Sequence, residues 1–391
     1  MDERRSSGKV PANKRIYMIA GEASGDLHGG NLINALKKLD PSIQIRAWGG
    51  DRMQAEGAEV VKHYRELAFM GFAEVIKNLP TILRNLRKCK EDIAKFKPDA
   101  VILIDYPGFN LRIAEYAHAL EIPIHYYISP QVWAWKKGRV HQIKRVVDHM
   151  YVILPFEEKW YSEYGVKVHF IGHPLLDELD RYRSTEVPAL PEGMVDAKGI
   201  IALLPGSRRQ EIAKMLPLMK RMVTHFPEYR FIIAAAPSVP PAVYEELLDG
   251  TAIQIVHDRT YDVLRSATAA LVTSGTATLE AALLNVPLAI CYKGSALNVW
   301  LARRMVKVKF IGLVNLIMDR EVVRELIQSG LNEGSMRTEL QRLIADEAYR
   351  KRMLNDFAQL RKWLGGSGAS KKVASAVWKT MANDPKNTTA A

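Results

Sequence analysis

The stretch Thr273-Ser274-Gly275-Thr276-Ala277-Thr278-Leu279-Glu280 follows an apolar run, Ala269 to Val272, and opens a helical run, Leu279 to Leu284. A strand, a turn of small residues and a helix start can bind an anion. The first amides of a helix have no partner within it, and the helix dipole adds positive potential. Glu280 stands one turn into the helix, where a carboxylate can reach ribose hydroxyls. On this stretch alone, an ordinary capped helix of an α/β sheet is an equal alternative.

A second loop of this kind, Pro205-Gly206-Ser207-Arg208-Arg209, directly follows the apolar run Ile200 to Leu204. Glycine lets the backbone approach a phosphate, serine adds a donor, and arginine presents a planar pair of donors. Two such loops at strand ends of one domain indicate a diphosphate site. The sequence contains no G-x-x-x-x-G-K-[ST] and no Asp-x-Asp, which argues against a P-loop NTPase and a carboxylate-held metal ion. This combination is typical of a nucleotide-sugar transferase that stabilises its leaving group with arginine and helix amides.

Apolar strands alternate with helical runs along most of the chain. In the second half the expected strands are Ile200 to Leu204, Phe231 to Ala235, Ala252 to Val256, Ala269 to Val272 and Leu288 to Tyr292. In the first half they are Lys14 to Ala20, Ile43 to Trp48, Ala100 to Ile104, Ile124 to Ile128, His149 to Leu154 and Val168 to Ile171. Strands that alternate with helices form parallel sheets with right-handed crossovers. We therefore expect an α/β protein of two Rossmann-like domains with the active site in the cleft between them.

Polar, aperiodic or glycine-rich segments mark the expected boundaries. Arg181 to Lys198 bears prolines and is typical of a linker, and Gly365-Gly366-Ser367-Gly368 interrupts the helical C-terminal part. The expected division is a disordered N-terminus over 1–13, an N-terminal Rossmann-like domain over 14–180, a linker over 181–198, a C-terminal Rossmann-like domain over 199–364, a C-terminal helix over 365–383 that packs back on the N-terminal domain, and a disordered tail over 384–391.

The composition is that of a globular protein with an excess of positive charge. Of 391 residues, 48% are hydrophobic and 25% charged, and the formal net charge is +12 with a pI of about 9.5. This charge suggests an anionic partner: a nucleic acid, a nucleotide or an acidic membrane face. No run reaches the ~18–20 apolar residues of a spanning helix, and the polar N-terminus is not a secretory signal. Cys89 and Cys291 have no metal-ligand spacing and fit a reducing compartment.

Acidic side chains stand at the carboxyl ends of expected strands, where ligands bind in α/β sheets. Asp105 follows the apolar run Ala100 to Ile104 and precedes a Pro-Gly turn, which is a good position for a general base. Capping of the next helix is the alternative. Glu22 and Asp26 lie in the turn after the first strand, where site chemistry and helix capping are equally open. That turn lacks G-x-G-x-x-G, so it does not predict a dinucleotide site.

The segment Ala73 to Phe96 combines helical apolar spacing with a strong basic bias. Its apolar positions are Leu79, Ile82, Leu83, Leu86 and Ile93, and its basic ones are Lys77, Arg84, Arg87, Lys88, Lys90 and Lys95. Such a helix can lie on an anionic bilayer, although the segment alone favours a crossover helix packed on the sheet. Trp133 and Trp135 stand beside a basic cluster and could form a sugar or acyl platform, or a packed loop.

Eight motifs, in family order from about Arg15 to Leu364, resemble the lipid-A-disaccharide synthases, family-19 glycosyltransferases of the two-Rossmann GT-B architecture. The motifs are Gly21-Glu22-Ala23-Ser24-Gly25-Asp26 with Gly29 beyond, Gly71-Phe72-Ala73-Glu74-Val75, Asp105-Tyr106-Pro107-Gly108-Phe109-Asn110, Tyr127-Ile128-Ser129-Pro130-Gln131-Val132-Trp133-Ala134-Trp135, Gly172-His173-Pro174, Leu204-Pro205-Gly206-Ser207-Arg208, Ser274-Gly275-Thr276-Ala277-Thr278-Leu279-Glu280 and Val314-Asn315. Motifs in this number and order are specific to the family.

The resemblance implies an inverting transfer from UDP-2,3-diacylglucosamine to 2,3-diacylglucosamine 1-phosphate. The products are the β-1′,6-linked lipid A disaccharide 1-phosphate and UDP, in lipopolysaccharide biosynthesis. It implies Asp105 as the base that takes the proton of the acceptor 6-hydroxyl, with Glu22 and Asp26 as acceptor-side groups and alternative bases. The implied UDP-sugar site comprises Gly206, Ser207, Arg208, Ser274, Gly275, Thr276, Ala277, Glu280 and Asn315. No cofactor or metal ion is expected, because the UDP-sugar is a substrate.

The resemblance also favours a membrane role for the basic segment. Each buried methylene of an acyl chain contributes roughly 0.8 kcal/mol, so a four-chain product stays in a bilayer and the enzyme must reach it there. The expected acyl or membrane contacts are Leu79, Ile82, Leu83, Arg84, Leu86, Arg87, Trp133 and Trp135. We expect a cytoplasmic protein bound peripherally to the anionic cytoplasmic face of the inner membrane, with acylated glucosamine substrates and no nucleic-acid partner. A homo-oligomer is left open.

Other functions stay open from the sequence. Another GT-B enzyme of UDP-sugars, a UDP-GlcNAc transferase or 2-epimerase, shares the architecture but needs no acyl chains. A non-catalytic nucleic-acid binder is suggested by charge alone. It predicts an aromatic-studded basic face, whereas basic residues here are dispersed among the α/β elements. An NAD-dependent dehydrogenase is disfavoured by the missing glycine fingerprint.

Overall fold

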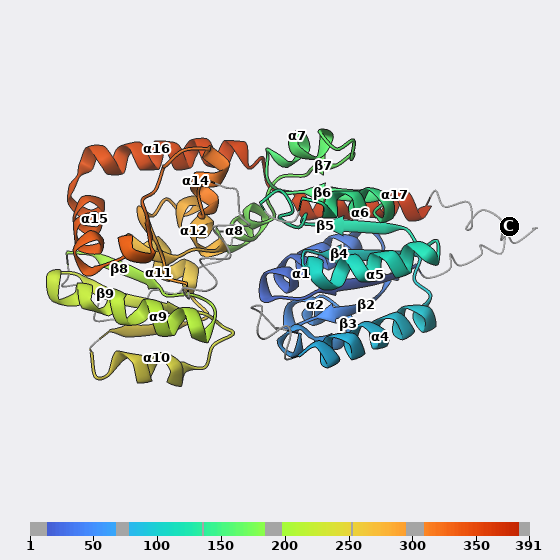
Figure 1. Ribbon diagram of the computed structural model, residues 1–391, viewed down its shortest axis with the longest axis horizontal. Coiled ribbons are helices and arrows are strands. Elements are labelled where there is room, and N and C mark those ends of the chain that lie inside the picture. Colours follow the sequence, from blue (N-terminus) through green and yellow to red (C-terminus); the bar gives the residue numbers. More distant parts are fainter. Residues whose placement is uncertain are drawn as a thin grey trace, which may run out of the picture. The chain divides into compact units, whose positions relative to one another are not determined.

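The computed structural model describes residues 14–67, 78–134, 137–183, 198–251, 253–294 and 309–382 (Figure 1). Contacts divide the chain into two compact units. Unit 1 runs to Trp133, continues over Lys137–Asp180 and resumes at Gly366, whereas unit 2 comprises Arg181–Gly365 and the short piece that begins at Ala134. Each unit contains one parallel sheet whose strands are connected by helices, which confirms the predicted α/β class of two Rossmann-like domains.

Unit 1 is built on a seven-stranded sheet in the order β3-β2-β1-β4-β5-β6-β7, with all neighbours parallel. The strands are β1 (Arg15–Ala20), β2 (Gln44–Gly49), β3 (Glu59–His63), β4 (Ala100–Ile104), β5 (Ile124–Tyr127), β6 (His149–Val152) and β7 (His169–Phe170). The central strands β1 and β4 are apolar and almost wholly buried, as a parallel sheet covered on both faces requires.

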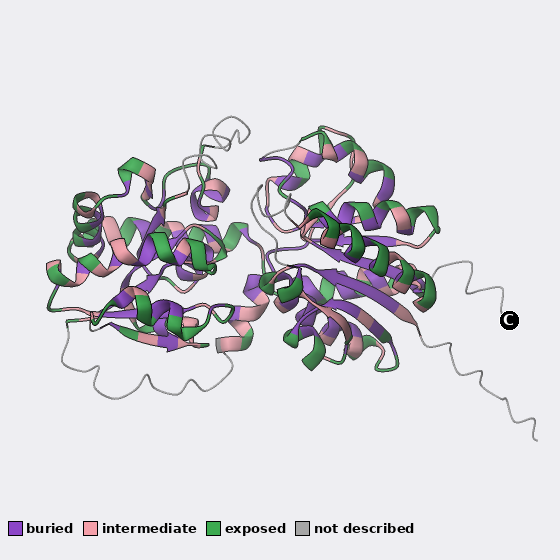
Figure 2. Ribbon diagram, turned by 60° about the horizontal axis from the view of Figure 1, so that its bottom comes forward, coloured by how far each residue is buried: buried purple, intermediate pink, exposed green. Residues whose placement is uncertain are grey.

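The helices of unit 1 cover both faces of this sheet. They are α1 (Ala23–Leu39), α2 (Asp51–Ala55), η1 (Tyr64–Glu66), α4 (Leu79–Phe96), α5 (Pro107–Ala119), α6 (Arg139–Val146), α7 (Glu157–Ser162), α8 (Leu175–Arg183) and α17 (Ala369–Ala382). Successive residues of a strand point to opposite faces. Ile16 and Met18 of β1 therefore pack in a core with α1 and α17, whereas Tyr17 and Ile19 pack with α4 and α5. Figure 2 shows buried strands and helices with exposed outer sides.

The C-terminal helix α17 packs on α1, with Val373 and Val377 fully buried. Asp177 of α8 accepts hydrogen bonds from the backbone nitrogens of Ala369 and Ser370, at 3.3 and 2.9 Å, which caps the N-terminus of α17. α8 itself continues to Arg183, past the expected start of the linker. The rest of that segment, residues 184–197, lies outside the described residues, as do the two expected disordered ends, 1–13 and 384–391.

Unit 2 is built on a six-stranded parallel sheet in the order β10-β9-β8-β11-β12-β13. The strands are β8 (Ile200–Leu204), β9 (Arg230–Ala235), β10 (Gln254–His257), β11 (Ala267–Thr273), β12 (Leu288–Tyr292) and β13 (Glu325–Ile327). The helices are α9 (Arg209–Met219), η2 (Lys220–His225), α10 (Pro241–Leu248), α11 (Thr260–Ser266), α12 (Thr276–Leu283), α14 (Leu313–Met318), η3 (Gln328–Gly330), α15 (Glu333–Ala345) and α16 (Glu347–Trp363). The two predicted anion loops follow β8 and β11, which are neighbours at the centre of the sheet.

Candidate active site

Asp105 and Glu22 follow two neighbouring central strands of unit 1. β1 and β4 are parallel and Ala20 pairs with Ile104, so the residues after each strand lie at the same edge of the sheet. Burial, and in second place the carboxylate of Glu22, raise the pKa of Asp105 to about 7. Asp105 still keeps partial solvent exposure. A partly exposed carboxyl group whose pKa is raised toward neutral pH is suited to act as a general base.

The turn after β4 has an uncommon backbone conformation. Asp105 and Tyr106 have φ angles of 44° and 50°, a left-handed conformation that costs a non-glycine residue roughly 1–2 kcal/mol. The carbonyl oxygen of Asp105 accepts hydrogen bonds from Nδ2 of Asn110 at 2.7 Å and from the hydroxyl of Tyr126 at 2.6 Å. These two side chains therefore stabilise the conformation of the turn.

Gly21 leaves room for the ring of Tyr106 beside the end of β1. A Cβ atom at Gly21 would lie 2.3 Å from Cγ of Tyr106, so no larger residue fits without movement of the ring. The next residue, Glu22, stands at the N-cap of α1, makes no capping hydrogen bond with its side chain and keeps partial exposure. Burial raises the pKa of Tyr106, and the charge of Glu22 adds to this effect. Glu22 is thus the acidic neighbour of the turn that carries Asp105.

Asp26, one of the two alternative bases, caps a helix. Its carboxylate accepts hydrogen bonds from the backbone nitrogens of Gly50, Arg52 and Met53, at 2.7, 3.0 and 3.1 Å, around the N-terminus of α2. The residue is only 3% exposed. Its oxygens are engaged by backbone donors that α2 needs to have satisfied. Asp26 therefore holds the N-terminus of α2 in place, and its role as an alternative base stays a prediction.

The loop after β8 already holds an anionic group, the side chain of Glu211. Gly206 has a φ of +125°, which only glycine adopts without strain, and a Cβ there would lie 2.7 Å from that of Glu211. The backbone nitrogen of Ser207 donates to Oε2 of Glu211 at 3.1 Å, and Nη1 of Arg208 donates to Oε1 at 3.0 Å. The donors predicted to bind a phosphate therefore bind a carboxylate. The sequence interpretation missed Glu211, although a glutamate at the third helical position commonly reaches back over a helix start.

The loop after β11 lies at the same sheet edge, because β8 and β11 pair with Leu204 opposite Val272. Gly275 and Thr276 are exposed, and a Cβ at Gly275 would meet no atom of the described residues within 4 Å. α12 begins at Thr276 without a side-chain cap, and Ala277 is partly exposed. The hydroxyl of Ser274 donates to the carbonyl oxygen of Ile311 at 3.2 Å, which ties the loop to the approach to α14. Open space before an uncapped helix start is suited to a phosphate group.

Glu280 is held by a tyrosine that the sequence interpretation did not single out. The hydroxyl of Tyr261, on α11, donates to Oε1 of Glu280 at 3.1 Å. The ring of Tyr261 in turn makes an edge contact with that of Tyr182, with centroids 5.2 Å apart. Glu280 keeps partial exposure, so its carboxylate is oriented yet reachable. Such a group can accept hydrogen bonds from sugar hydroxyls.

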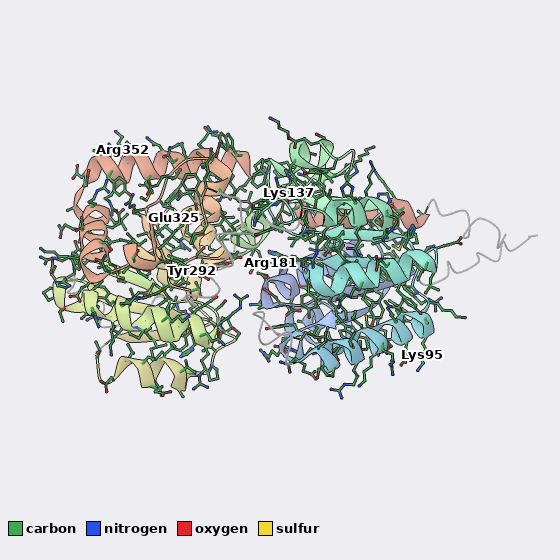
Figure 3. All side chains as sticks on the ribbon, viewed as in Figure 1. Lys95, Lys137, Arg181, Tyr292, Glu325 and Arg352 are labelled. Carbon is green, nitrogen blue, oxygen red and sulfur yellow. The ribbon has the colours of Figure 1, made fainter. Side chains whose placement is uncertain are left out.

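Asn315, which is expected beside the UDP-sugar, lies in the interior of unit 2. The residue is fully buried. Its Nδ2 donates to the carbonyl oxygen of Val323 and to Glu325, at 2.8 and 2.9 Å, and its Oδ1 accepts from the backbone nitrogens of Val322 and Val323, at 2.8 and 2.9 Å. Glu325, labelled in Figure 3, also accepts from the backbone nitrogen of Gly312 at 3.0 Å. Because all four bonding positions of the amide are filled, the side chain of Asn315 orders this backbone, and its place in the UDP-sugar site stays a prediction.

α4 presents part of the surface predicted to contact acyl chains. Its exposed residues include Leu79, Leu83, Arg84, Arg87 and Lys88. The two leucines are 44% and 54% exposed. Leu86 is buried and Ile82 packs against the same core, so the helix also crosses over the sheet. No helix in the part of the chain that the structure describes is long and apolar enough to span a bilayer.

Trp133 is a packed side chain. It is 9% exposed, its Nε1 donates to Oε1 of Glu157 at 3.2 Å, and its ring makes an edge contact with Phe156. Burial raises the pKa of Glu157 to about 7. Little of the indole is left for lipid, so the predicted acyl contact at Trp133 has no support in its position. Trp135 and the motif over residues 71–75 lie outside the described residues.

Metal-ligating side chains do not gather in the described ranges, where no three His, Cys, Asp or Glu residues are placed to hold an ion. Cys89 and Cys291 are buried free thiols. The expectation that no metal or cofactor takes part remains a prediction.

Solved structures of low sequence identity share the fold. The UDP-GlcNAc 2-epimerase from Neisseria meningitidis, solved bound to UDP-GlcNAc, has a TM-score of 0.63 at 14% identity, over 93% of this chain and 100% of that one. CalG4, the calicheamicin glycosyltransferase, has a TM-score of 0.58 at 17% identity, over 95% and 99%. The two parallel-sheet units thus define the class of GT-B glycosyltransferases and the 2-epimerases that share their fold.

Sequence relatives narrow this class to one family. Residues 16–377 match the family model described as Lipid-A-disaccharide synthetase. The lipid-A-disaccharide synthase of Trichlorobacter lovleyi is 39% identical over 370 residues, 93% of this chain and 97% of that protein. That of Myxococcus xanthus is 38% identical over 369 residues, 93% and 96% of the two chains. The chain belongs to the lipid-A-disaccharide synthase family and is a glycosyltransferase of lipid A biosynthesis, which confirms the predicted family and enzyme class.

Proposed function

We propose that the enzyme transfers the sugar of UDP-2,3-diacylglucosamine to the 6-hydroxyl of 2,3-diacylglucosamine 1-phosphate. The products are the β-1′,6-linked disaccharide 1-phosphate and UDP. Family membership supports these substrates. The observation that carries the chemistry is Asp105, a partly exposed carboxyl group at the edge of the central strands, whose pKa is raised to about 7.

The reaction is a single displacement. Asp105 takes the proton of the acceptor 6-hydroxyl while that oxygen attacks C1 of the donor sugar. The bond between C1 and the diphosphate breaks, and the anomeric carbon inverts from α to β. General-base catalysis of this kind contributes roughly 10²–10⁴-fold in rate. Glu22 lies nearby with the same charge, so it favours uptake of the proton by Asp105.

The leaving diphosphate binds unit 2. Arg208 and the backbone nitrogen of Ser207 form one set of donors, and the uncapped start of α12 at Thr276 forms the other. Both sets follow the neighbouring strands β8 and β11. Glu280, oriented by Tyr261, accepts hydrogen bonds from the ribose. Charge that develops on the leaving oxygen is thus stabilised by arginine and helix amides.

The enzyme binds its lipid substrates at the anionic cytoplasmic face of the inner membrane. Leu79 and Leu83 of α4 are exposed and suited to enter the boundary between headgroups and acyl chains. Arg84 and Arg87 are exposed on the same helix, and a basic residue close to an anionic surface contributes roughly 1 kcal/mol. The net charge of +12 adds long-range attraction.

The proposal is tested by measuring disaccharide formation from the two acylated substrates, in detergent with EDTA. We expect activity in the wild type and a loss of roughly 10²-fold or more in Asp105→Ala and Asp105→Asn, at unchanged folding. Asp249→Asn is a matched control, because Asp249 is an exposed aspartate that also has a left-handed φ, of 49°. It should keep wild-type activity.

Other outcomes assign the function differently. A wild type that is inactive with these substrates, yet releases UDP or forms an epimer from unacylated UDP-GlcNAc, would belong with the UDP-sugar enzymes that share the fold. Retained activity in Asp105→Ala would keep the reaction and move the base role to Glu22 or Asp26. Inhibition of the wild type by EDTA would contradict the metal-independent mechanism.

A further inference from the structure

The backbone at Asp105 and Tyr106 is the feature of unit 1 that the fold does not require. Two consecutive residues with side chains adopt the left-handed conformation, with φ angles of 44° and 50°. A turn that only joins a strand to a helix is built at lower cost with glycine at such positions. Strained backbone persists where the surrounding structure over-determines it, and it gathers at functional sites.

The contacts that impose this strain come from two fully buried side chains. Asn110, in the first turn of α5, donates from Nδ2 to the carbonyl oxygen of Asp105 at 2.7 Å and to that of Ile104 at 3.2 Å. Tyr126, on β5, donates its hydroxyl to the same oxygen of Asp105 at 2.6 Å. One carbonyl group therefore receives two donors, one from the helix and one from the strand that follow β4 in the chain.

Neither side chain can move far from this position. Tyr126 pairs with Leu103 in the ladder between β4 and β5, one strand away from the group it holds. The backbone nitrogen of Asp105 donates to the carbonyl oxygen of Tyr127 at 3.2 Å, and that of Asn110 donates to the carbonyl oxygen of Tyr106 at 3.0 Å. The turn is thus fixed at both ends and at its centre.

We infer that Asn110 and Tyr126 are positioning residues for Asp105, which hold the strained turn so that its carboxyl group faces the acceptor hydroxyl. The inference rests on the proposed role of Asp105 as base. We call the turn over Asp105 and Tyr106, at the end of the central strand β4, the elbow. The contacts of Asn110 and Tyr126 keep it rigid. When neighbouring side chains hold the base in its productive position, no further conformational entropy is lost in ordering it for proton transfer.

The decisive variant is Tyr126→Phe, because it removes one hydroxyl and keeps the ring. Tyr127→Phe is the matched control: it removes a hydroxyl from the next, equally buried residue of β5, whose side chain lies in the core on the other face. We expect Tyr126→Phe to lower kcat by roughly 10- to 100-fold, as a displacement of about 1 Å does. KM for both substrates, and kcat of the control, should stay within about twofold. Asn110→Ala should change kcat in the same direction as Tyr126→Phe.

The pKa of Asp105 is a second readout, because a smaller amount of folded protein does not change it. Burial and Glu22 raise its pKa to about 7. A relaxed turn lets the carboxyl group leave this position, so the acid limb of kcat/KM should move to lower pH in Tyr126→Phe and not in Tyr127→Phe. The carboxyl carbon of Asp105, followed by NMR and assigned with Asp105→Asn, should show the same shift without turnover.

Each result has a defined meaning. Wild-type kcat with an unchanged titration in Tyr126→Phe overturns the inference, and so does a loss of kcat that only matches the loss of folded protein. If the wild type forms no disaccharide while the NMR titration moves as expected, the proposed function fails and the elbow stands. If the wild type is active, Asp105→Asn is inactive and the titration does not move, the function stands and the elbow fails.

Discussion

The guanidinium group of Arg208 and the carboxylate of Glu211 form an ion pair, with Nη1 of the arginine 3.0 Å from Oε1 of the glutamate. The second oxygen of the same carboxylate accepts from the backbone nitrogen of Ser207 at 3.1 Å. One carboxylate therefore uses both donors of the loop that the proposed function gives to the diphosphate. The donor substrate must displace Glu211 or share these donors with it.

Substitution of Glu211 tests this competition. Glu211→Gln removes a negative charge beside the diphosphate, and at about 4 Å in water such a charge contributes about 1 kcal/mol of repulsion. We expect this variant to bind UDP roughly 3- to 10-fold more tightly by calorimetry. Glu246→Gln is the control, because it removes the same charge from a glutamate that pairs with the side chain of the next residue, Arg209, at 3.9 Å. Weaker binding by Glu211→Gln would show that the carboxylate orders the loop for its ligand.

Glu22 should set the pH dependence of the reaction. A base must be ionised, so kcat/KM should rise with pH through the pKa of Asp105, about 7. Glu22→Gln removes a like charge, which lowers that pKa and moves the acid limb down by roughly half to one pH unit. Glu22→Asp keeps the charge and should leave the limb near its wild-type position. Loss of activity at every pH in Glu22→Gln would instead identify Glu22 as the base.

The ionised carboxylate of Asp105 should lower the free energy of unfolding of the protein at neutral pH. Its pKa in the folded state, about 7, is above the ordinary value of 3.8, so the folded state binds more protons between these values. Stability is thus lost as pH rises from about 4 to 7. Asp105→Asn should raise the free energy of unfolding at pH 8 by roughly 1–3 kcal/mol, limited by the partial exposure of the residue, and by little at pH 4. Denaturant unfolding at the two pH values measures this, and an equal effect at both would contradict it.

The basic face of α4 should govern binding to membranes. Reversal of Arg84, Arg87 and Lys88 to glutamate should lower partitioning onto vesicles with anionic lipid by roughly 10- to 100-fold, as measured by co-sedimentation. Leu79→Ser combined with Leu83→Ser should weaken binding at low and high salt alike, because it removes apolar burial rather than charge.

The control for this experiment is a reversal of equal charge elsewhere. Arg337, Lys351 and Lys362 are exposed on α15 and α16 of unit 2. Their change to glutamate lowers the net charge by the same amount and should leave most of the binding intact. Equal losses in both triple variants would mean that net charge, rather than α4, attracts the protein to lipid, and unchanged sedimentation of the α4 variant would remove the membrane contact from the proposal.

The central strands of both sheets could be predicted because they are apolar along their whole length. β1, β4, β8 and β11 all lie within or close to the expected ranges. The edge strands β3 and β13 are not among the expected strands. These strands are short and only partly buried, with three residues in β13. A strand of this kind has too little hydrophobic periodicity to be recognised locally.

The sequence pattern located the predicted site residues but not the contacts that they make. Asp105 and Glu280 could be located because each stands at a fixed distance from an apolar run. The family resemblance placed Asn315 beside the substrate. In the structure, all hydrogen-bonding positions of its amide are occupied by the backbone of Val322 and Val323 and by Glu325. Glu211 was overlooked because its role appears only when the loop folds back on the first turn of α9.

By itself, the sequence determined the alternation of strands and helices, the two anion loops and the positions of the acids after the strands. Each of these patterns lies within a few neighbouring residues. Only the tertiary structure decided which acid is engaged by backbone donors and which has a raised pKa. Asp26 is engaged by Gly50, which lies 24 residues away, whereas Asp105 is raised in pKa by burial and by Glu22 from another strand end. Burial and the supply of backbone donors depend on segments distant in the chain, so no local pattern contains them.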